Sequence, residues 1–323
     1  MCRSYDGARP TVVQVTLQQL LDGVAGPTCA GALATVVGRD GSVWTGASAG
    51  LDPDAVFRCA SNTKTFTAAA VLRLVEQGRL ALGQAVELGP GRTATVEQLL
   101  RHTSGLPDHA SDPSYVAAVE ADPTRTWTRH EQVERALALP PAGPVGTQVQ
   151  YSDTGYVILG GLLEEATGQP LADVLADVCE LAGLTTTRLE DTLPEGRAPQ
   201  QFGDRDVWSL SATSDLFGGG GLVTTTRELA GFYRALLDGR LLGDELLEAM
   251  LTSTDLPGNE RALGMGIYRT PPAAGDWWGH TGFWNTAAGA ERGTSAAVAV
   301  CVLQQPVEGV PMAADLAADL VSR

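Results

Sequence analysis

Short runs of apolar and β-branched residues occur near both ends of the chain, and such runs predict strands. Residues 30–38 and 42–47 are two of them, and the Asp40-Gly41 pair between them is a strong signal for a tight hairpin turn. Further short runs separated by turn residues follow much later, over residues 264–269, 277–280, 286–289 and 295–303. We therefore expect one sheet that both ends of the chain complete.

Helical periodicity occurs once near each end and dominates the middle of the chain. Apolar spacing predicts helices over residues 12–21 and 313–321, and a long helix over residues 62–76 that is buried on most sides. From about residue 81 to residue 214, helical pieces are broken by proline and glycine. The clearest of these pieces cover residues 96–102, 129–139, 156–167 and 171–180.

These patterns predict an α/β (α+β) fold, in which an antiparallel sheet built from both termini is flanked by helices and carries a mainly helical inserted subdomain. We expect residues 1–80 together with 215–323 to form the sheet subdomain, and residues 81–214 to form the helical one. The cleft between two such units is the usual place for a ligand site.

Composition narrows the choice of partners. The 323 residues are 44% hydrophobic and 19% charged, which is typical of a soluble globular protein. The net charge of −16 argues against nucleic acid or an anionic membrane as partner, because both attract basic surfaces. The first residues lack the apolar stretch of a secretory signal, and no later segment approaches a membrane span, so we expect a cytoplasmic protein.

Cysteines and histidines are too scattered to predict a metal site. The five cysteines form no CxxC pair, which suits reduced thiols, and the four histidines form no HxxxH or HExxH pair. We therefore expect no metal and no cofactor, and a small molecule as the binding partner.

Lys64 is the only lysine among the 22 lysine and arginine residues of the chain. A surface cation can be either residue, whereas only the lysine amine can lose its proton when its surroundings lower its pKa. The alternative is that Lys64 has no special role and is a lysine by chance in a sequence that otherwise uses arginine. The motifs around it favour a chemical role.

Ser61 precedes Lys64 by three residues, which places both side chains on one face if the segment is helical. A serine hydroxyl is a weak nucleophile until a base takes its proton, and a desolvated lysine amine can be that base. The same serine could instead simply cap the helix that starts there. The SxxK spacing alone does not decide between these interpretations.

Two further motifs follow in the chain. Tyr151-Ser152-Asp153 stands where a Pro/Gly-rich loop gives way to a helix, and His280-Thr281-Gly282 lies on a predicted strand and is followed by Phe283. In this order and spacing, with SxxK before them, the motifs resemble the serine β-lactamase and D,D-peptidase superfamily on its class C and esterase-like side. Residues 96–106 and 219–225 also resemble segments of that family, and the similarity spans about residues 30–303.

The resemblance implies a role for each matching position. Ser61 would be the acylated nucleophile, Lys64 its activating partner, and Tyr151 the phenol that relays protons to the leaving group and from the incoming acceptor. His280-Thr281-Gly282 would align the substrate along a strand. The backbone N–H groups of Ser61 and Phe283 would form the oxyanion hole.

Asp153 departs from the family pattern, which usually has asparagine there. A carboxylate at this place should favour the protonated form of Lys64 and weaken it as a base. Either Tyr151 is then the deprotonated group, or a substrate amine takes up the charge of Asp153. We expect Asp153 to select an acyl group that carries an amine.

The third motif departs as well. His280 stands in place of lysine, and Phe283 in place of a residue with a hydroxyl group. Fewer side chains are then left to bind a substrate carboxylate, which argues against β-lactam and D-Ala-D-Ala substrates. Trp277, Trp278 and Trp284 gather around Phe283, and this group either packs into the core or lines an apolar pocket for the acceptor or leaving group, with Trp284 as a substrate contact.

Two other segments are interpreted as structural. Residues 102–105 (His-Thr-Ser-Gly) are expected to be a helix end that turns into a loop. The glycines at 218–221 are expected to allow tight packing beside the cleft, because no GK[ST] follows to make them a phosphate loop.

The resulting prediction is a serine hydrolase that forms a Ser61 acyl-enzyme on a small intracellular ester, amide or peptide. One alternative is an acyltransferase or transpeptidase that passes the acyl group to an amine in specialised metabolite biosynthesis. Another is a catalytically silent binding protein that keeps the same fold.

Overall fold

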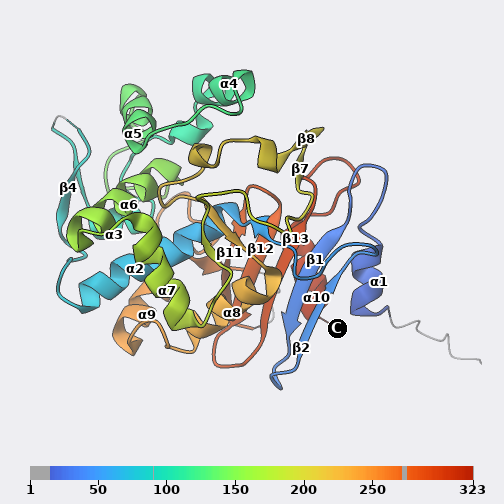
Figure 1. Cartoon of the computed structure of the whole chain (residues 1–323). Helices are drawn as coiled ribbons and strands as arrows, with labels where there is room; N and C mark the ends of the chain where they lie inside the picture. Colours follow the sequence, from blue (N-terminus) through green and yellow to red (C-terminus); the bar gives the residue numbers. More distant parts are fainter. Residues whose placement is uncertain (1–14, 90, 271–274, 323) are drawn as a thin grey trace, which may run out of the picture.

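The computed structural model describes residues 15–89, 91–270 and 275–322 (Figure 1). Its α-helices are α1 Leu17–Asp22, α2 Thr63–Glu76, α3 Val96–Leu100, α4 Pro113–Ala121, α5 Arg129–Ala138, α6 Asp153–Thr167, α7 Leu171–Ala182, α8 Thr226–Leu237, α9 Asp244–Leu251 and α10 Ala313–Val321. Its strands are β1 Ala32–Val37, β2 Val43–Ala47, β3 Phe57–Arg58, β4 Ala85–Glu87, β5 Thr93–Thr95, β6 Arg188–Leu189, β7 Gln201–Phe202, β8 Arg205–Asp206, β9 Leu222–Thr224, β10 Tyr268–Arg269, β11 Trp277–Gly282, β12 Thr286–Glu291 and β13 Ala297–Val302.

The main sheet has six strands in the order β10-β11-β12-β13-β1-β2, and all neighbours are antiparallel. Strand β1 pairs with β13 from Ala32 opposite Val302 to Val37 opposite Ala297, so the first strand lies beside the last. Figure 1 shows these two strands side by side, the blue one against the red one. The predicted sheet from both ends of the chain is confirmed, with mainly helical segments between its two halves.

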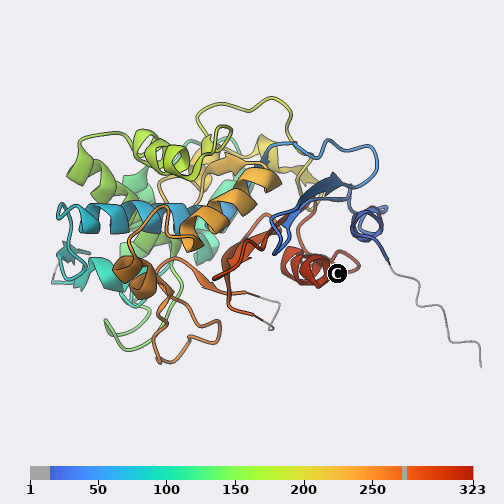
Figure 2. The ribbon, with the colours of Figure 1, turned by 90° about the horizontal axis from the view of Figure 1, so that it is seen from below.

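Both faces of the sheet are covered by helices, and its side chains alternate between two cores. On β1, Ala34 belongs to the cluster that includes Leu316 of α10, whereas its neighbour Leu33 belongs to the cluster that includes Phe232 of α8. Figure 2 shows α10 on one side of the sheet and α8 and α2 on the other. Because both faces are buried, the strands contain apolar residues at consecutive positions.

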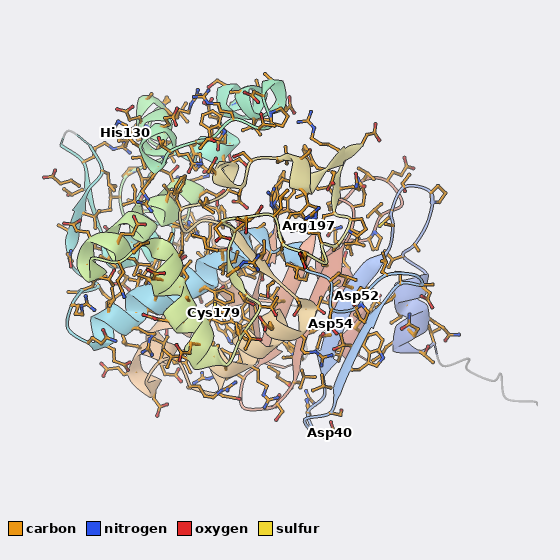
Figure 3. All side chains as sticks on the ribbon, viewed as in Figure 1. Asp40, Asp52, Asp54, His130, Cys179 and Arg197 are labelled. Carbon is orange, nitrogen blue, oxygen red and sulfur yellow. The ribbon has the colours of Figure 1, made fainter. Side chains whose placement is uncertain are left out.

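The hairpin of β1 and β2 has the turn that its sequence predicts. Asp40 accepts the backbone N–H of Ser42 on its Oδ1 (2.9 Å), and Gly41 has a φ of +82°, which glycine adopts at little cost. The side chain of Asp40 lies at the tip of this hairpin, far from the helical part (Figure 3).

Helix α2 runs through the centre of the molecule and is buried from Thr63 to Leu72. Phe66 on this helix stacks on Phe232 of α8, with ring centroids 3.4 Å apart. The burial on most sides is as expected. The helix begins one residue later than predicted, because residues 60–62 form a 3₁₀ turn.

Several element bounds differ from the prediction. Only Tyr268–Arg269 of the expected strand 264–269 pairs in the sheet. The expected helix over residues 12–21 is described from Leu17, where Thr16 closes a capping box with Gln19, and residues 12–14 lie outside the described part. Within the described residues, no helix reaches the length and apolarity that a bilayer span demands.

Candidate active site

Ser61 and Lys64 lie in direct contact at the start of α2. Ser61 is part of the 3₁₀ turn Ala60–Asn62, and the Lys64 Nζ donates a hydrogen bond to its Oγ (3.0 Å). Ala60 has a φ of +49°, a left-handed conformation that non-glycine residues adopt only at some cost, so the turn that presents Ser61 is tight. Ser61 caps no helix, because α2 begins at Thr63 and its N-cap residue Asn62 makes no side-chain capping bond. The capping interpretation is therefore wrong.

The Lys64 ammonium is fully buried and donates to three acceptors. These are the Ser61 Oγ, the Asp153 Oδ1 and the Gly219 carbonyl oxygen (2.6 Å). An ammonium has three N–H bonds, so this arrangement uses all of them. Burial disfavours the charged form, but the Asp153 carboxylate, through its charge and its hydrogen bond, outweighs burial and raises the pKa of Lys64. The resting site therefore holds a protonated lysine, as the carboxylate at position 153 predicts.

Tyr151 lies over the lysine from the loop that precedes α6. Its ring centroid is 5.1 Å from the Lys64 Nζ. Burial raises the pKa of the phenol, and the nearby side chains of Lys64 and Ser61 offset this only in part. Tyr151 is therefore a neutral phenol beside a charged lysine, and both hold their protons.

His102 packs against Tyr151 and is a residue that the sequence interpretation missed. Their rings stack with centroids 4.4 Å apart, and the His102 Nδ1 accepts the backbone N–H of Ser152 (3.1 Å). Burial, and after it the charge of Lys64, lowers the pKa of His102 to about 3, so the ring is neutral with its proton on Nε2. The segment is a helix end, as predicted, but its histidine also holds the loop of the second motif.

Strand β11 carries a neutral histidine. The His280 Nδ1 donates to the carbonyl oxygen of Thr281 (2.6 Å), and burial followed by the charge of Lys64 lowers its pKa to about 3. The Thr281 N–H donates to the hydroxyl of Tyr268 (2.6 Å), which also bonds the Thr281 hydroxyl. This part of the strand offers no positive charge to a substrate carboxylate.

Gly282 brings the end of β11 against the turn that carries Ser61. A Cβ at this position would collide with the carbonyl oxygen of Cys59, and the Thr286 hydroxyl donates to the same carbonyl (3.0 Å). The backbones of Ser61 and Phe283 therefore belong to segments that pack directly together. The oxyanion hole formed by their N–H groups remains a prediction.

Two further carboxyl groups surround the pair of Lys64 and Asp153, and neither was predicted. The Asp153 N–H donates to the Asp108 Oδ1 (3.1 Å), and burial together with the charge of Asp153 raises the pKa of Asp108 to about 6. The same two causes raise the pKa of Asp215 to about 7. Gly220 has a reason to be glycine, since a Cβ there would collide with the Asp215 carboxyl group. Tight packing beside the site is thus the correct interpretation of residues 218–221.

The aromatic group around β11 divides between core and surface. Trp277 and Trp278 are buried in the cores on opposite faces of the sheet, and Trp284 is 8% exposed. Phe283 is 59% exposed. Among the histidines, His130 lies on the outside of α5 (Figure 3), and its side chain is 78% exposed.

The comparison with known families agrees with this geometry. The sequence model of the family described as Beta-lactamase matches residues 17–322. The chain belongs to the beta-lactamase family. Members of this family are serine hydrolases, and the fold described above is the β-lactamase and transpeptidase fold.

Solved structures resemble nearly the whole chain. The crystal structure of a D-stereospecific amidohydrolase from Streptomyces sp. is 28% identical, with a TM-score of 0.81, and the similarity covers 90% of this chain and 94% of that one. The D-amino acid amidase from Ochrobactrum anthropi SV3 has a TM-score of 0.78 at 23% identity, over 95% of this chain and 98% of its own, which shows a shared fold.

Curated relatives in the family match shorter stretches. PbpX of Bacillus subtilis (strain 168) is 26% identical over 231 residues, which are 68% of this chain and 55% of that protein. Esterase EstB of Burkholderia gladioli is 35% identical over 135 residues, 37% of this chain and 34% of its own. The chain thus spans about half or less of the length of these relatives.

Proposed function

We propose that this serine hydrolase cleaves amides or esters through a Ser61 acyl-enzyme, and that the acyl group of its substrate carries a free amine. The observation that carries the proposal is the ion pair of Lys64 with Asp153, made inside a group of three carboxyl side chains. Such a site has more acidic groups than its single lysine neutralises. It is therefore complementary to a cationic substrate.

A substrate ammonium would also release the catalytic base. When the ammonium pairs with Asp153, that carboxylate is shared between two cations, and the new positive charge disfavours the charged form of Lys64. Both effects lower the pKa of Lys64. The Lys64 ammonium then gives a proton to solvent, and the neutral amine, with Tyr151 beside it, can accept a proton only while the correct substrate is bound.

The reaction follows from these positions. The Ser61 Oγ attacks the substrate carbonyl carbon, and its proton passes to the pair of Lys64 and Tyr151 as the tetrahedral intermediate forms. Tyr151 gives a proton to the leaving nitrogen or oxygen, and the bond to the carbonyl carbon breaks. Water then attacks the carbonyl carbon of the acyl-enzyme and loses a proton to the same pair, which passes a proton to the Ser61 Oγ as its bond to the carbonyl carbon breaks, so that the carboxylic acid and the free Ser61 hydroxyl are released.

The names of two similar proteins support an amide or ester as the bond that is cleaved. The 28% identical Streptomyces protein is named as a D-stereospecific amidohydrolase, and the Burkholderia gladioli relative as an esterase. The neutral His280 supports an uncharged or cationic substrate over an anionic one. We therefore place α-amino acid amides and esters first among candidate substrates.

The test compares matched substrate pairs by intact-mass spectrometry and steady-state kinetics. Amides and activated esters of α-amino acids are set against the same acyl groups without the amine, and the Ser61→Ala variant serves as control. We expect an acyl adduct on the wild type alone, with kcat/KM at least tenfold higher for the amine-bearing member of each pair. Equal rates for both members would overturn the role of the amine, and absence of any adduct on Ser61 would overturn the acyl-enzyme.

Added amines separate the hydrolase from the acyltransferase alternative. If water is the acceptor, the product of each turnover remains the free acid when amines are supplied. A product that is mostly the new amide would assign acyl transfer instead.

A further inference from the structure

The carboxyl group of Asp215 lies against the glycine segment that binds Lys64. A Cβ on Gly220 would come within 2.2 Å of the Asp215 Cγ. A Cβ on the preceding Gly219 would lie 3.3 Å from the Asp153 Oδ1, and the Gly219 carbonyl oxygen accepts a hydrogen bond from the Lys64 Nζ (2.6 Å). Two carboxyl groups thus contact consecutive glycines in the immediate surroundings of the lysine.

The Asp215 carboxyl group has no cation of its own. Among residues 15–89, 91–270 and 275–322, no group donates a hydrogen bond to it or forms an ion pair with it. The three N–H bonds of Lys64 are already used, and Arg58 binds Glu190 and two backbone carbonyl oxygens. Asp215 is only partly buried, so part of its surface is accessible to a ligand. A cationic ligand would supply the partner that an ionised Asp215 lacks.

Asp108, the other carboxyl group beside Asp153, differs in this respect. Its Oδ1 accepts the N–H groups of Asp153 (3.1 Å) and Ala110 (3.2 Å), and its Oδ2 accepts the hydroxyl of Ser111 (3.0 Å). Both oxygens are thus occupied by the chain itself. Of these two carboxyl groups, Asp215 is the one that is free to bind a ligand.

The loop that carries Asp215 is fixed on both sides. On one side, the Tyr115 hydroxyl of α4 donates to the Ser214 carbonyl oxygen (3.0 Å). On the other side, the Thr67 hydroxyl of α2 donates to the Gly218 carbonyl oxygen (2.8 Å). The carboxyl group is therefore held in place before a ligand binds, so that little ordering would be needed on binding.

The charge balance of the site indicates what the substrate carries. Lys64 offsets one of the three carboxylates, and the ammonium that the proposed function places at Asp153 offsets a second. In the mechanism above, Lys64 also gives up its proton, which makes the site more negative still. We propose that Asp215 binds a positively charged side chain on the acyl group of the substrate, so that basic α-amino acid amides and esters are the preferred class. This inference rests on the proposed function and names its substrate class.

The charge of Asp215 changes within the working pH range. Burial and the charge of Asp153 raise its pKa to about 7. The other titratable groups around it are the cations Lys64 and Arg58, the carboxylate Glu190, and the neutral Tyr115 and Cys59. Asp215 is therefore mostly protonated at about pH 5.5 and mostly ionised at about pH 8. A preference for a cationic side chain should accordingly increase with pH.

The experiment measures kcat/KM for pairs of amides that differ only in the side-chain ammonium. Lysine amide is compared with norleucine amide, and ornithine amide with norvaline amide, so that two side-chain lengths are tested. For the wild type at about pH 8 we expect the charged member of at least one pair to react about tenfold faster or more, the usual effect of a hydrogen bond to a charged group. This ratio should fall toward one at about pH 5.5. In Asp215→Asn it should be near one at both pH values, whereas Asp177→Asn, which removes the same charge from the exposed side of α7, should keep the wild-type ratio.

The outcomes separate this inference from the proposed function. If none of the amides acylates Ser61, the proposed function fails first. If norleucine amide reacts but both wild-type ratios are near one at about pH 8, the role of Asp215 is wrong while the acyl-enzyme stands. A ratio that persists in Asp215→Asn would equally overturn that role. Turnover of norleucine amide shows that the variant is folded, and Asp215→Ser repeats the comparison if Asp215→Asn turns over neither member of a pair.

Discussion

The imidazole ring of His102 stacks on the phenol ring of Tyr151 while its Nδ1 accepts the N–H of the next residue, Ser152. One side chain thus holds both the ring and the backbone of the second motif. His280 approaches Tyr151 as well, with ring centroids 6.3 Å apart, and burial keeps both imidazoles neutral. Tyr151 is therefore positioned by two uncharged imidazole rings, and Lys64 is the nearby cation whose charge favours ionisation of the phenol.

His102 is predicted to be a positioning residue. His102→Phe keeps the stacked ring but loses the acceptor for Ser152, and His102→Asn keeps an acceptor but loses the ring. We expect each variant to lower kcat for acylation by about 10- to 100-fold, because small displacements of a reacting group have effects of this size. KM should change little. The basic limb of the pH profile of kcat/KM should also shift in both, since the surroundings of the phenol change; an unchanged profile with only a lower melting temperature would assign His102 a purely structural role.

Asp153→Asn tests the amine-binding carboxylate. Loss of the charge should raise KM about 10- to 100-fold for substrates with an α-amine, the range expected for a hydrogen bond to a charged group. Substrates without the amine should be affected much less, because they make no use of this charge. Steady-state kinetics on the matched pairs measures the difference, and equal effects on both members would remove the idea.

Lys64→Arg tests whether position 64 needs an amine or only a cation. The side chain is fully buried with three acceptors around one nitrogen, a geometry that a planar guanidinium cannot reproduce. We expect acylation of Ser61 to slow by about 10²-fold or more, the usual contribution of proton transfer by a positioned group. Circular dichroism at the assay temperature verifies that the variant is folded, and nearly unchanged acylation in a folded Lys64→Arg would show that Lys64 is only a cation.

A buried ion pair supports the turn that carries Ser61. Arg58 binds Glu190 through two hydrogen bonds (2.6 and 2.8 Å) and also donates to the carbonyl oxygens of Val207 and Leu210. Arg58→Met should lower the free energy of unfolding by about 3–5 kcal/mol, because it leaves the Glu190 carboxylate buried without its partner. In the double variant Arg58→Met/Glu190→Leu we expect a smaller loss, measured by urea unfolding. A double variant less stable than Arg58→Met would contradict this account.

Asp215 makes stability depend on pH in a defined direction. Its pKa is raised to about 7 in the folded chain from the ordinary value of 3.8, so the folded state binds more protons between these values. The stability contributed by this group is present below about pH 4 and is lost as the pH rises through about 7. Asp215→Asn lacks this dependence, and the difference in free energy of unfolding between wild type and variant should fall from pH 5 to pH 8 in urea titrations. A difference that stays constant would mean that Asp215 is ionised throughout.

The sheet and the contacts of the motifs could be predicted from the sequence for physical reasons. The strands at both ends carry consecutive apolar residues because both faces of the sheet are covered, and the Asp40-Gly41 turn fixes their hairpin. Ser61 and Lys64 are close in the chain, so their contact depends only on local geometry. Asp153 reaches the same lysine from another helix, which the resemblance to a known family made predictable.

Other parts of the site depend on tertiary packing and left no such signal. Asp108 and Asp215 are ordinary loop carboxylates in the sequence, and their raised pKa values come from burial beside Asp153. Phe202 lies on a two-residue strand, and the hydrogen bonds of its hairpin to the segment after β13, together with its packing against Trp284, place it near Phe283. These residues meet because of long-range contacts that periodicity does not encode.

One helix that was not predicted has a recognisable signal in the sequence. Helix α8 was not predicted, although Thr225 caps it by accepting the N–H of Glu228, and Leu229, Phe232 and Leu236 follow at helical spacing. The glycines and threonines that precede the helix favour strand or turn, so the helical spacing was not recognised. Burial of this face against the sheet is what stabilises the helix.

The pairing of β1 with β13 has a consequence for the order of events during synthesis. The centre of the sheet joins two strands that leave the ribosome almost a whole chain apart, so the sheet cannot close until Val302 has emerged. Contacts between such distant segments also slow folding, because a long loop must close before they form. The nascent protein would therefore carry its nucleophile without the strands that complete the sheet and the site, and it would gain reactivity only after these strands have emerged.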